Sequence, residues 1–164
     1  MCQSPRVSAA ETTPVRIGVL RDYPLRLWAE QEEHTQALLR EFSLLLIGAD
    51  SAPLRDAAPG RLVVLANLFQ SRFGLLLQSI SSERQAAYDR GQDRMDSLIP
   101  LVEGAPELLE QVRQVLDDAD DFCRTGDLLL LPRPPHLVAL SAWVHAELVA
   151  QYGGAAPTPW PGPF

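Results

Sequence analysis

Four aspartates crowd into one five-residue stretch, Asp117, Asp118, Asp120 and Asp121 (DDADD). Carboxylates can bind calcium, but the stretch lacks the alternating acids, the glycine and the terminal glutamate of an EF-hand loop. We expect these aspartates in the last two turns of a helix, where the macrodipole disfavours each anion by roughly 0.3–1 kcal/mol. They either form a solvated face, with Arg124 as local compensation, or hold an arginine from elsewhere in the fold or from a partner. We therefore take all four, with Arg124, as candidate partner-binding residues.

A second polar group interrupts an apolar helical pattern at residues 30–35 (EQEEHT). Apolar residues recur at three- and four-residue steps before and after it, so these polar turns belong to one long helix. They either extend into solvent, as charged residues usually do, or form a polar pocket in which buried carboxylates need partners. The residues of this expected pocket are Glu30, Glu32, His34 and Thr35.

The spacing of histidines and glutamates argues against metal and phosphotransfer chemistry. A di-iron bundle needs a Glu-x-x-His pair on each of two helices, whereas Glu30 and His34 are four residues apart. His136 and His145 have no glutamate three residues before them. A histidine phosphotransfer bundle resembles this architecture, but it usually has Lys and Gly after its histidine, and residues 36–40 contain neither. We therefore expect no metal site and no phosphorelay histidine.

The residues of nucleophilic catalysis are missing as well. No serine lies in a G-x-S-x-G elbow, and no glycine loop could bind phosphate. Cys123 falls on the apolar stripe of its helix, where a thiol is usually buried and inert. All 14 basic residues are arginines, which excludes Schiff-base chemistry and the phosphate-loop lysine. We expect a protein without catalytic residues or cofactors.

The elements that must position these residues are predicted to be helices. Apolar periodicity places long helices at Asp22–Gly48, Arg61–Gln78, Gly104–Arg124 and 135–152, and a short one at Glu83–Arg90. Asp22 is a good N-cap for the first helix. We expect Val15–Leu20 to lie extended and Asp93–Val102 to be irregular or extended, because Pro100 disfavours a helix there. The predicted fold class is an all-α compact bundle of four long helices plus one short helix.

A single domain is expected over residues 15–154, after a disordered tail at 1–14 and before a Pro-rich tail at 155–164. The prolines at 157, 159, 161 and 163 make this tail polyproline-like, and Trp160 and Phe164 are available to dock on the body. Trp143 on the last helix belongs either to the core or, if exposed, to an interface, where tryptophan is a typical hot spot.

Composition restricts the classes of partner. The 164-residue chain is 46% hydrophobic and 21% charged, which is ordinary for a soluble globular protein. Its net charge of −7 argues against binding a nucleic acid. The longest apolar runs, such as Leu44–Ile47 and Leu128–Leu131, are too short to span a bilayer, and the N-terminus lacks a signal-peptide core. Two cysteines make no disulfide framework, so a reducing cytoplasm is expected.

Four stretches together resemble a known family. They are Leu20–Leu27 (LRDYPLRL), Leu38–Gly48 (LLREFSLLLIG), Leu116–Arg124 (LDDADDFCR), and Pro134–Tyr152 with the tail GAAPTPWP. They are similar to a family of uncharacterised actinobacterial proteins that often lie beside anti-sigma-factor-type ATP-binding kinases, STAS-domain antagonists and PP2C-type phosphatases. The resemblance covers most of residues 15–160 and implies partner-switching or stress-response signalling, without catalytic residues. The family's last helix is more basic and aromatic around its tryptophan than Ser141–Val144 is here.

The sequence therefore predicts a non-enzymatic cytoplasmic regulatory module that works by binding protein. The resemblance implies an anti-sigma-factor-type kinase, a STAS protein or a phosphatase as the partner. A homodimer through the first or the last helix is a further expectation, since pairing of helix faces is an easy route to a symmetric interface. The alternative is a small-molecule sensor with a polar pocket in the helical bundle.

Overall fold

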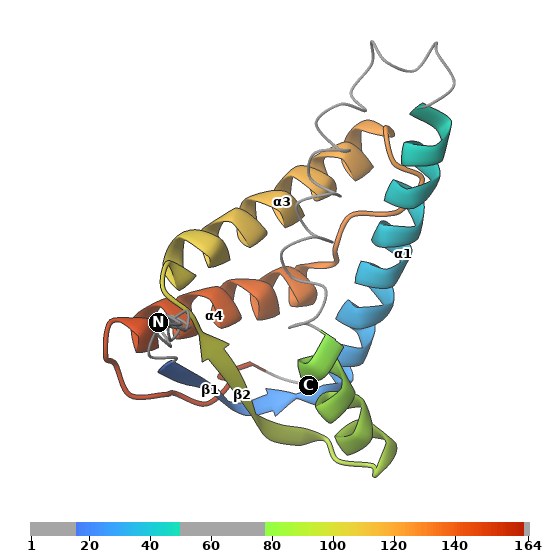
Figure 1. Cartoon of the computed structure of the whole chain (residues 1–164). Coiled ribbons are helices and arrows are strands. Elements are labelled where there is room, and N and C mark those ends of the chain that lie inside the picture. The colour runs from blue at the N-terminus through green and yellow to red at the C-terminus, as the bar shows by residue number, and fades with distance from the viewer. Residues whose placement is uncertain (1–15, 50–77, 163–164) are drawn as a thin grey trace, which may run out of the picture.

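The computed structural model describes residues 16–49 and 78–162 (Figure 1). Its elements are strand β1 (Arg16–Pro24), helix α1 (Leu25–Ala49), a short helix over residues 78–89, strand β2 (Arg94–Leu101), and helices α3 (Ala105–Thr125) and α4 (Pro135–Tyr152). The expected N-terminal tail, the expected helix at 61–78 (apart from its last residue) and Phe164 lie outside the described residues. The side chains of Phe42 and of residues 45–49 are not described either.

The predicted all-α bundle of four long helices and one short helix is wrong, because a two-stranded antiparallel sheet belongs to the fold. β1 and β2 pair from Arg16 opposite Leu101 to Pro24 opposite Arg94. The two strands are far apart along the chain, so neither segment has a local partner. Local periodicity therefore gave no sign that these two extended segments form one sheet.

The first long helix begins at Leu25 rather than at Asp22. The strand continues through Pro24, with an irregularity between Leu20 and Tyr23 at which Asp22 has a positive φ of 50°. The Asp22 N–H donates to Asp96 Oδ1 at 3.0 Å, across the strand pair. The expected N-cap is thus a strand residue, and the Leu25 N–H at the helix start donates instead to the Asp93 carbonyl at 2.9 Å.

Pro100 does not interrupt β2, because its backbone faces away from β1. The Val19 N–H donates to Gln151 Oε1 at 2.8 Å, and the Val19 carbonyl accepts from Gln151 Nε2 at 2.8 Å. Val19 thus directs its backbone groups away from β2, and so must Ile17, because orientation alternates along an antiparallel strand. Pro100 lies opposite Ile17. A proline there removes no hydrogen bond of the sheet and takes a donor from the outer edge.

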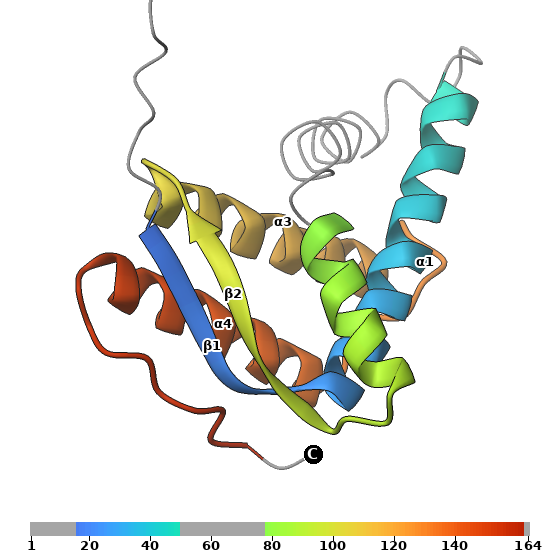
Figure 2. The ribbon, with the colours of Figure 1, turned by 60° about the horizontal axis from the view of Figure 1, so that its bottom comes forward.

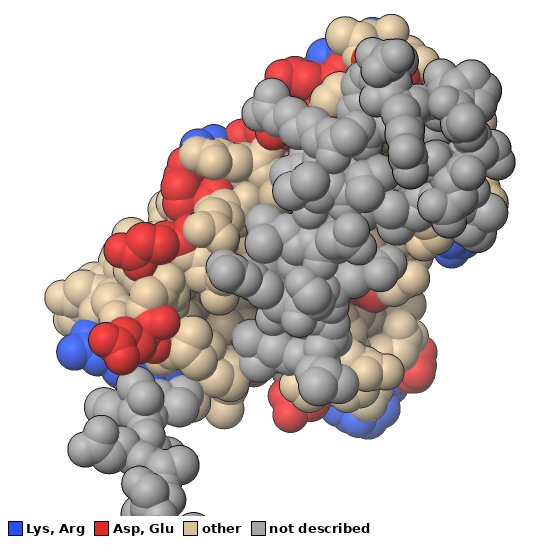
Figure 3. Space-filling view, turned by 45° about the horizontal axis from the view of Figure 1, so that its top comes forward, with Lys and Arg blue, Asp and Glu red and all other residues tan. Residues whose placement is uncertain are grey.

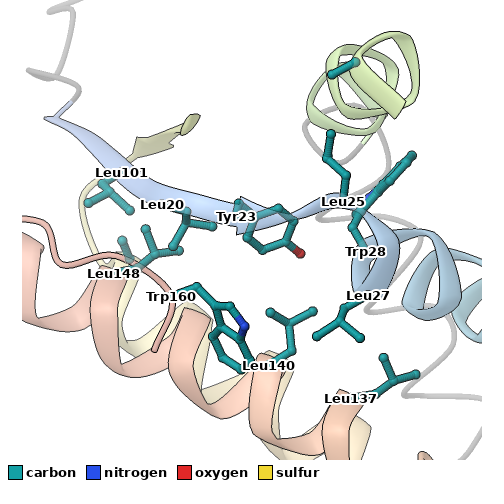
Figure 4. Packing of buried hydrophobic residues seen from close by; sticks show 12 residues of the cluster. Leu20, Tyr23, Leu25, Leu27, Trp28, Leu101, Leu137, Leu140, Leu148 and Trp160 are labelled. Atoms are coloured by element: carbon teal, nitrogen blue, oxygen red, sulfur yellow. The ribbon is translucent and has the colours of Figure 1, made fainter. Parts of the chain in front are cut away.

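One face of the sheet covers α4 and forms the main core (Figures 2 and 4). Gly18 lies so close to α4 that an added Cβ would be 2.8 Å from Leu148 Cδ2. The fully buried Leu20 continues this contact. The cluster consists of Leu20, Tyr23, Leu25, Leu27, Trp28, Ala87, Leu101, Ala105, Leu137, Leu140, Leu148 and Trp160.

The Pro-rich tail contributes Trp160 to this core. Trp160 is 8% exposed, and its backbone N–H donates to the Arg21 carbonyl at 3.1 Å, beside β1. The buried Glu147 of α4 accepts from the Thr158 N–H and hydroxyl, both at 2.7 Å. Figure 4 shows the Trp160 ring between the strand and α4. Residues 155–162 therefore belong to the folded body.

A second buried cluster joins α1, α3 and the segment after α3. It consists of Leu38 from α1, Ala119 from α3 and Leu128 from the segment after α3. Phe122, Cys123 and Leu130 lie partly buried against it. This cluster fixes the segment between α3 and α4, residues 126–134, which we call the connector.

Candidate interaction surface

The acidic cluster of α3 holds an arginine from elsewhere in the fold. Asp120 is buried, and its carboxylate accepts from the Arg133 backbone N–H at 2.8 Å and from Arg133 Nε at 2.9 Å. Arg133 Nη2 lies 2.8 Å from Asp120 Oδ2 and 3.0 Å from Asp117 Oδ1. Arg133 is buried as well, so this ion pair is desolvated and is completed by additional hydrogen bonds. For Asp117 and Asp120, the arginine that the sequence left open is therefore Arg133.

The end of the cluster faces solvent. The Asp121 side chain is 74% exposed and pairs with Arg124, one helical turn later. Asp118 is partly buried, and Asp127, just after α3, is exposed. Figure 3 shows that acidic side chains gather along the edge of the molecule formed by α3. Asp121 and Asp127 thus keep exposed carboxylates near the end of α3, the first paired with Arg124 and the second accepting from the Thr125 hydroxyl.

Arg113 organises the middle of the same helix. Its guanidinium donates to Glu110 at 2.6 Å and to Asp117 Oδ2 at 2.7 Å. The hydrogen bonds from Arg113 lower the pKa of Glu110 to about 2, so this carboxylate stays ionised at any physiological pH. The exposed side of α3 therefore carries an array of paired charges.

The connector presents two leucines to solvent. Leu128 is 3% exposed and Leu130 lies against the second cluster, whereas Leu129 is 95% exposed and Leu131 is 78% exposed. This alternation means that every second side chain anchors the segment and the others point outward. Single exposed leucines are common on protein surfaces, whereas contiguous exposed apolar patches mark interaction sites, so this pair of leucines makes the connector a candidate.

Carboxylates on both sides hold the connector in place. The N–H groups of Leu129 and Leu130 donate to the Glu41 carboxylate of α1, the second at 3.1 Å. Further along, the Arg133 N–H is bound to Asp120. The two exposed leucines are therefore displayed on a fixed backbone. We call Leu129, Leu131, Asp121 and Asp127 the connector surface.

The comparisons with known proteins do not identify this surface. Comparison of the chain finds no matching family model, no similar curated protein and no similar solved structure. The resemblance to the family of uncharacterised actinobacterial proteins thus stays a prediction.

The structure separates the four residues of the expected polar pocket. Glu30 Oε2 is 2.6 Å from His136 Nε2 at the start of α4. Glu32 instead accepts from Ser81 in the short helix at 3.2 Å. His34 and Thr35 are partly buried, and burial is the main cause that lowers the pKa of His34. These turns are neither fully solvated nor gathered around one common cavity.

A groove of about 730 Å³ does lie at the start of α4. Of the four expected pocket residues, only Glu30 lines it, and its other walls come from α1, α4 and the tail. The lining residues are Arg26, Leu27, Glu30, Pro135, His136, Ala139, Trp143, Trp160, Pro161 and Gly162. The groove combines an aromatic floor with an acidic and a basic side chain, a composition suited to a small ligand.

Trp143 lies at the floor of this groove rather than on an exposed helix face. Its ring stacks on Tyr23 with centroids 6.3 Å apart and meets Trp160 edge-on at 5.3 Å. It is partly buried against the main core, and its buried Nε1 has no hydrogen-bond partner among the described residues. The core interpretation of Trp143 fits these contacts better than an exposed hot spot does.

Other features of the described residues limit the chemistry. No three His, Cys, Asp or Glu side chains of residues 16–49 and 78–162 gather closely enough to hold a metal ion. None of the helices searched in this part of the chain is long and apolar enough to cross a membrane. The outer face of the sheet carries Ile17 and Leu98, each 55% exposed. These two residues form a second, less exposed apolar patch.

Sequence reasoning missed the residues that matter most here, namely Glu41, Leu129, Leu131, Arg133 and His136. One signal was present. Arg133 stands among leucines and prolines in LLLLPRPP, and an arginine in such an apolar stretch needs a carboxylate when the stretch is buried. The sequence could not predict which two of the four leucines at 128–131 are exposed, because the four residues are identical.

Proposed function

We propose that the protein is a non-enzymatic regulatory module that binds another protein through the connector surface. Partner-switching or stress-response signalling is the process we propose for it, supported by the four stretches that resemble the actinobacterial family. Under this proposal the partner is an anti-sigma-factor-type kinase, a STAS protein or a phosphatase. The support from the fold is independent of that resemblance.

The observation that carries the proposal is the exposure of Leu129 and Leu131 on a fixed backbone. Burial of both side chains in an interface would contribute about 3–6 kcal/mol. Because the connector is already anchored in the free protein, little conformational entropy is lost on binding. Preorganised, exposed leucines are costly to maintain in water and are best explained by a partner that covers them.

Quantitative affinity capture from the native lysate tests the proposal. Three tagged full-length proteins are compared: wild type, the Leu129→Ser/Leu131→Ser variant, and an Ile17→Thr/Leu98→Thr control. The control removes a less exposed pair of apolar side chains from the outer face of the sheet. We expect a protein that the wild type and the control both retain and that the leucine variant loses at least tenfold, on the usual scale of hot-spot residues. Its direct binding is then confirmed with purified components.

Two results would contradict the proposal. One is equal recovery of every captured protein by the wild type and the leucine variant. The other is loss of the same protein by both variants, because this would indicate non-specific adhesion to apolar surface. Circular dichroism and thermal unfolding of each variant ensure that a lost interaction does not reflect a lost fold.

A second candidate function, sensing of a small molecule, is supported by the groove beside Glu30 and His136. Native mass spectrometry of protein purified gently from its own lysate is the direct test. A bound small molecule that an Ala139→Trp variant no longer retains would support this function, since Ala139 lines the groove. If the wild type and the Ala139→Trp variant both have only the mass of the polypeptide, without a bound molecule, this result would argue against sensing of a small molecule.

A further inference from the structure

The backbone of the connector has few N–H groups left for a partner. Of residues 129–135, Leu129 and Leu130 donate their N–H groups to Glu41, and Arg133 donates its own to Asp120. The prolines at 132, 134 and 135 have no N–H. Only the Leu131 N–H remains, so an added β-strand would lack the ladder of donors that strand addition needs. The partner must therefore recognise side chains.

The charged residues around the exposed leucines indicate which charge the contact surface of a partner must carry. Residues 117–133 carry five aspartates and two arginines, a net charge of −3, although Arg124 pairs with Asp121 and Arg133 neutralises the buried Asp120. Asp127 precedes the exposed leucines by two residues, and Asp121 is exposed near the end of α3, which leads into them. The C-terminal end of α3 adds the negative end of a helix dipole to this potential. A partner that covers the leucines meets an acidic border.

The same charges disfavour a second copy of this chain on the connector surface. Each chain has a net charge of −7, and a two-fold contact would bring two identical acidic borders together. Like charges placed across an interface oppose association. The occupant consistent with these charges is a different protein with a positive border.

We infer that the connector surface binds a basic amphipathic helix of the partner, with its apolar face on Leu129 and Leu131 and its Lys or Arg side chains beside Asp121 and Asp127. This inference rests on the proposed function. A helix fits because it presents an apolar stripe flanked by charged residues without using backbone hydrogen bonds. Acidic residues around exposed leucines would then select the partner by charge and speed the encounter.

Two synthetic helical peptides with the same leucine face test the inference, one with lysines and one with glutamates on its border. Fluorescence anisotropy measures their affinity for full-length wild type, Leu129→Ser/Leu131→Ser and Asp121→Asn/Asp127→Asn. The matched control is Glu103→Gln/Glu107→Gln, which removes two exposed acids at the opposite end of α3. Both charge variants raise the net charge by the same amount.

We expect the lysine peptide to bind wild type and the glutamate peptide not to bind. Affinity for the lysine peptide should fall about tenfold in the leucine variant. It should fall about three- to tenfold in Asp121→Asn/Asp127→Asn at low salt, with the difference disappearing at high salt. The Glu103→Gln/Glu107→Gln control should bind like wild type.

Three results would overturn the inference: no binding of the lysine peptide, equal binding of the glutamate peptide, or equal losses in the two charge variants. The last would mean that only the net charge matters. If lysate capture still depends on Leu129 and Leu131, the proposed function stands while its basic partner is ruled out. If capture does not depend on them, the proposed function itself fails.

Discussion

Arg133 lies buried against Asp120, with Nε at 2.9 Å and Nη2 at 2.8 Å from Oδ2 of that carboxylate. The Arg133 backbone N–H donates to Oδ1 of the same group at 2.8 Å. One aspartate of α3 thus fixes both the side chain and the backbone of the connector just before α4. This pair, with Glu41 on the other side, holds the exposed leucines in place.

Replacement of Asp120 by alanine should be strongly destabilising. Arg133 would stay buried with Asp117 as its remaining acidic partner, and breaking such a pair costs about 3–5 kcal/mol. Urea unfolding measures the free energy of unfolding. Asp120→Ala/Arg133→Met should recover much of the loss, because an apolar side chain replaces the unpaired charge. A loss below about 1 kcal/mol in Asp120→Ala would contradict the burial of this pair.

The leucines of the connector should divide sharply into structural and exposed residues. Leu128→Ser should lower the free energy of unfolding by about 2–4 kcal/mol, because Leu128 is 3% exposed in the second cluster. Leu129→Ser/Leu131→Ser should change it by less than about 0.5 kcal/mol. Thermal and urea unfolding check both values. Similar losses in the two variants would show that the outer leucines are also packed in the fold.

The tail should loosen on acidification through Glu147. Burial raises the pKa of this carboxyl, but hydrogen bonds from Thr158 and Gln151 outweigh burial and lower it. Because the folded pKa is depressed, the stabilisation is fully present above the unfolded pKa, near 4.3, and is lost as pH falls through the folded value. At pH 7, Glu147→Gln should cost about 1–3 kcal/mol in free energy of unfolding.

Urea unfolding between pH 7 and pH 3 follows this difference between wild type and Glu147→Gln. The difference should shrink in the acidic range, whereas the exposed Glu107→Gln control should show no comparable effect. A difference that is constant over the whole range would mean that the ionised form of Glu147 does not hold the tail.

Gly18 should not tolerate a side chain. A Cβ there would lie 2.8 Å from Leu148 Cδ2 and 3.1 Å from Leu101 Cδ1, so Gly18→Ala should cost about 1–3 kcal/mol by overpacking. Leu148→Val removes the atom in closest contact. The double variant should therefore lose about 1 kcal/mol less than the sum of the single losses. Strict additivity in urea unfolding would rule out this close contact of β1 with α4.

Cys123 should react slowly. Burial, followed by the charges of Asp120 and Glu41, raises the pKa of its thiol to about 11. The thiolate is the reactive form, so alkylation near pH 8 should be on the order of a hundredfold slower than that of an ordinary cysteine. A Cys2→Ser background isolates this thiol, and the same protein in urea is the control. Equal rates in the folded and unfolded protein would contradict the shift.

Much of the helical structure was readable from local pattern. The predicted helix at 135–152 has the bounds of α4, and the one at Gly104–Arg124 differs from α3 by one residue at each end. Apolar periodicity and terminal glycine or proline suffice for such segments. The pairing of β1 with β2 was not readable, since it depends on contacts between distant segments. The strand character of Asp22 and Pro24 follows from the same pairing.

The candidate site was predicted only in part. The unfavourable placement of aspartates at a helix end correctly raised an arginine from elsewhere in the fold as one possibility, and Arg133 meets it. The polar turns at residues 30–35 gave no single pocket, because α4 and the short helix each bind a different glutamate. The Glu41 carboxylate, which accepts from the N–H groups of Leu129 and Leu130, helps to decide which leucines of the connector face solvent. No local sequence pattern reveals this contact.

Site-specific photocrosslinking in living cells tests the central claim most directly. A photoreactive phenylalanine derivative is placed at position 129 and, as a control, at position 98 on the outer face of the sheet. We predict a covalent adduct with another protein from position 129 that position 98 does not give. Crosslinking of position 129 only to residues 50–77 of its own chain, only to a second copy, or to the same proteins as position 98 would contradict a dedicated partner surface on the connector.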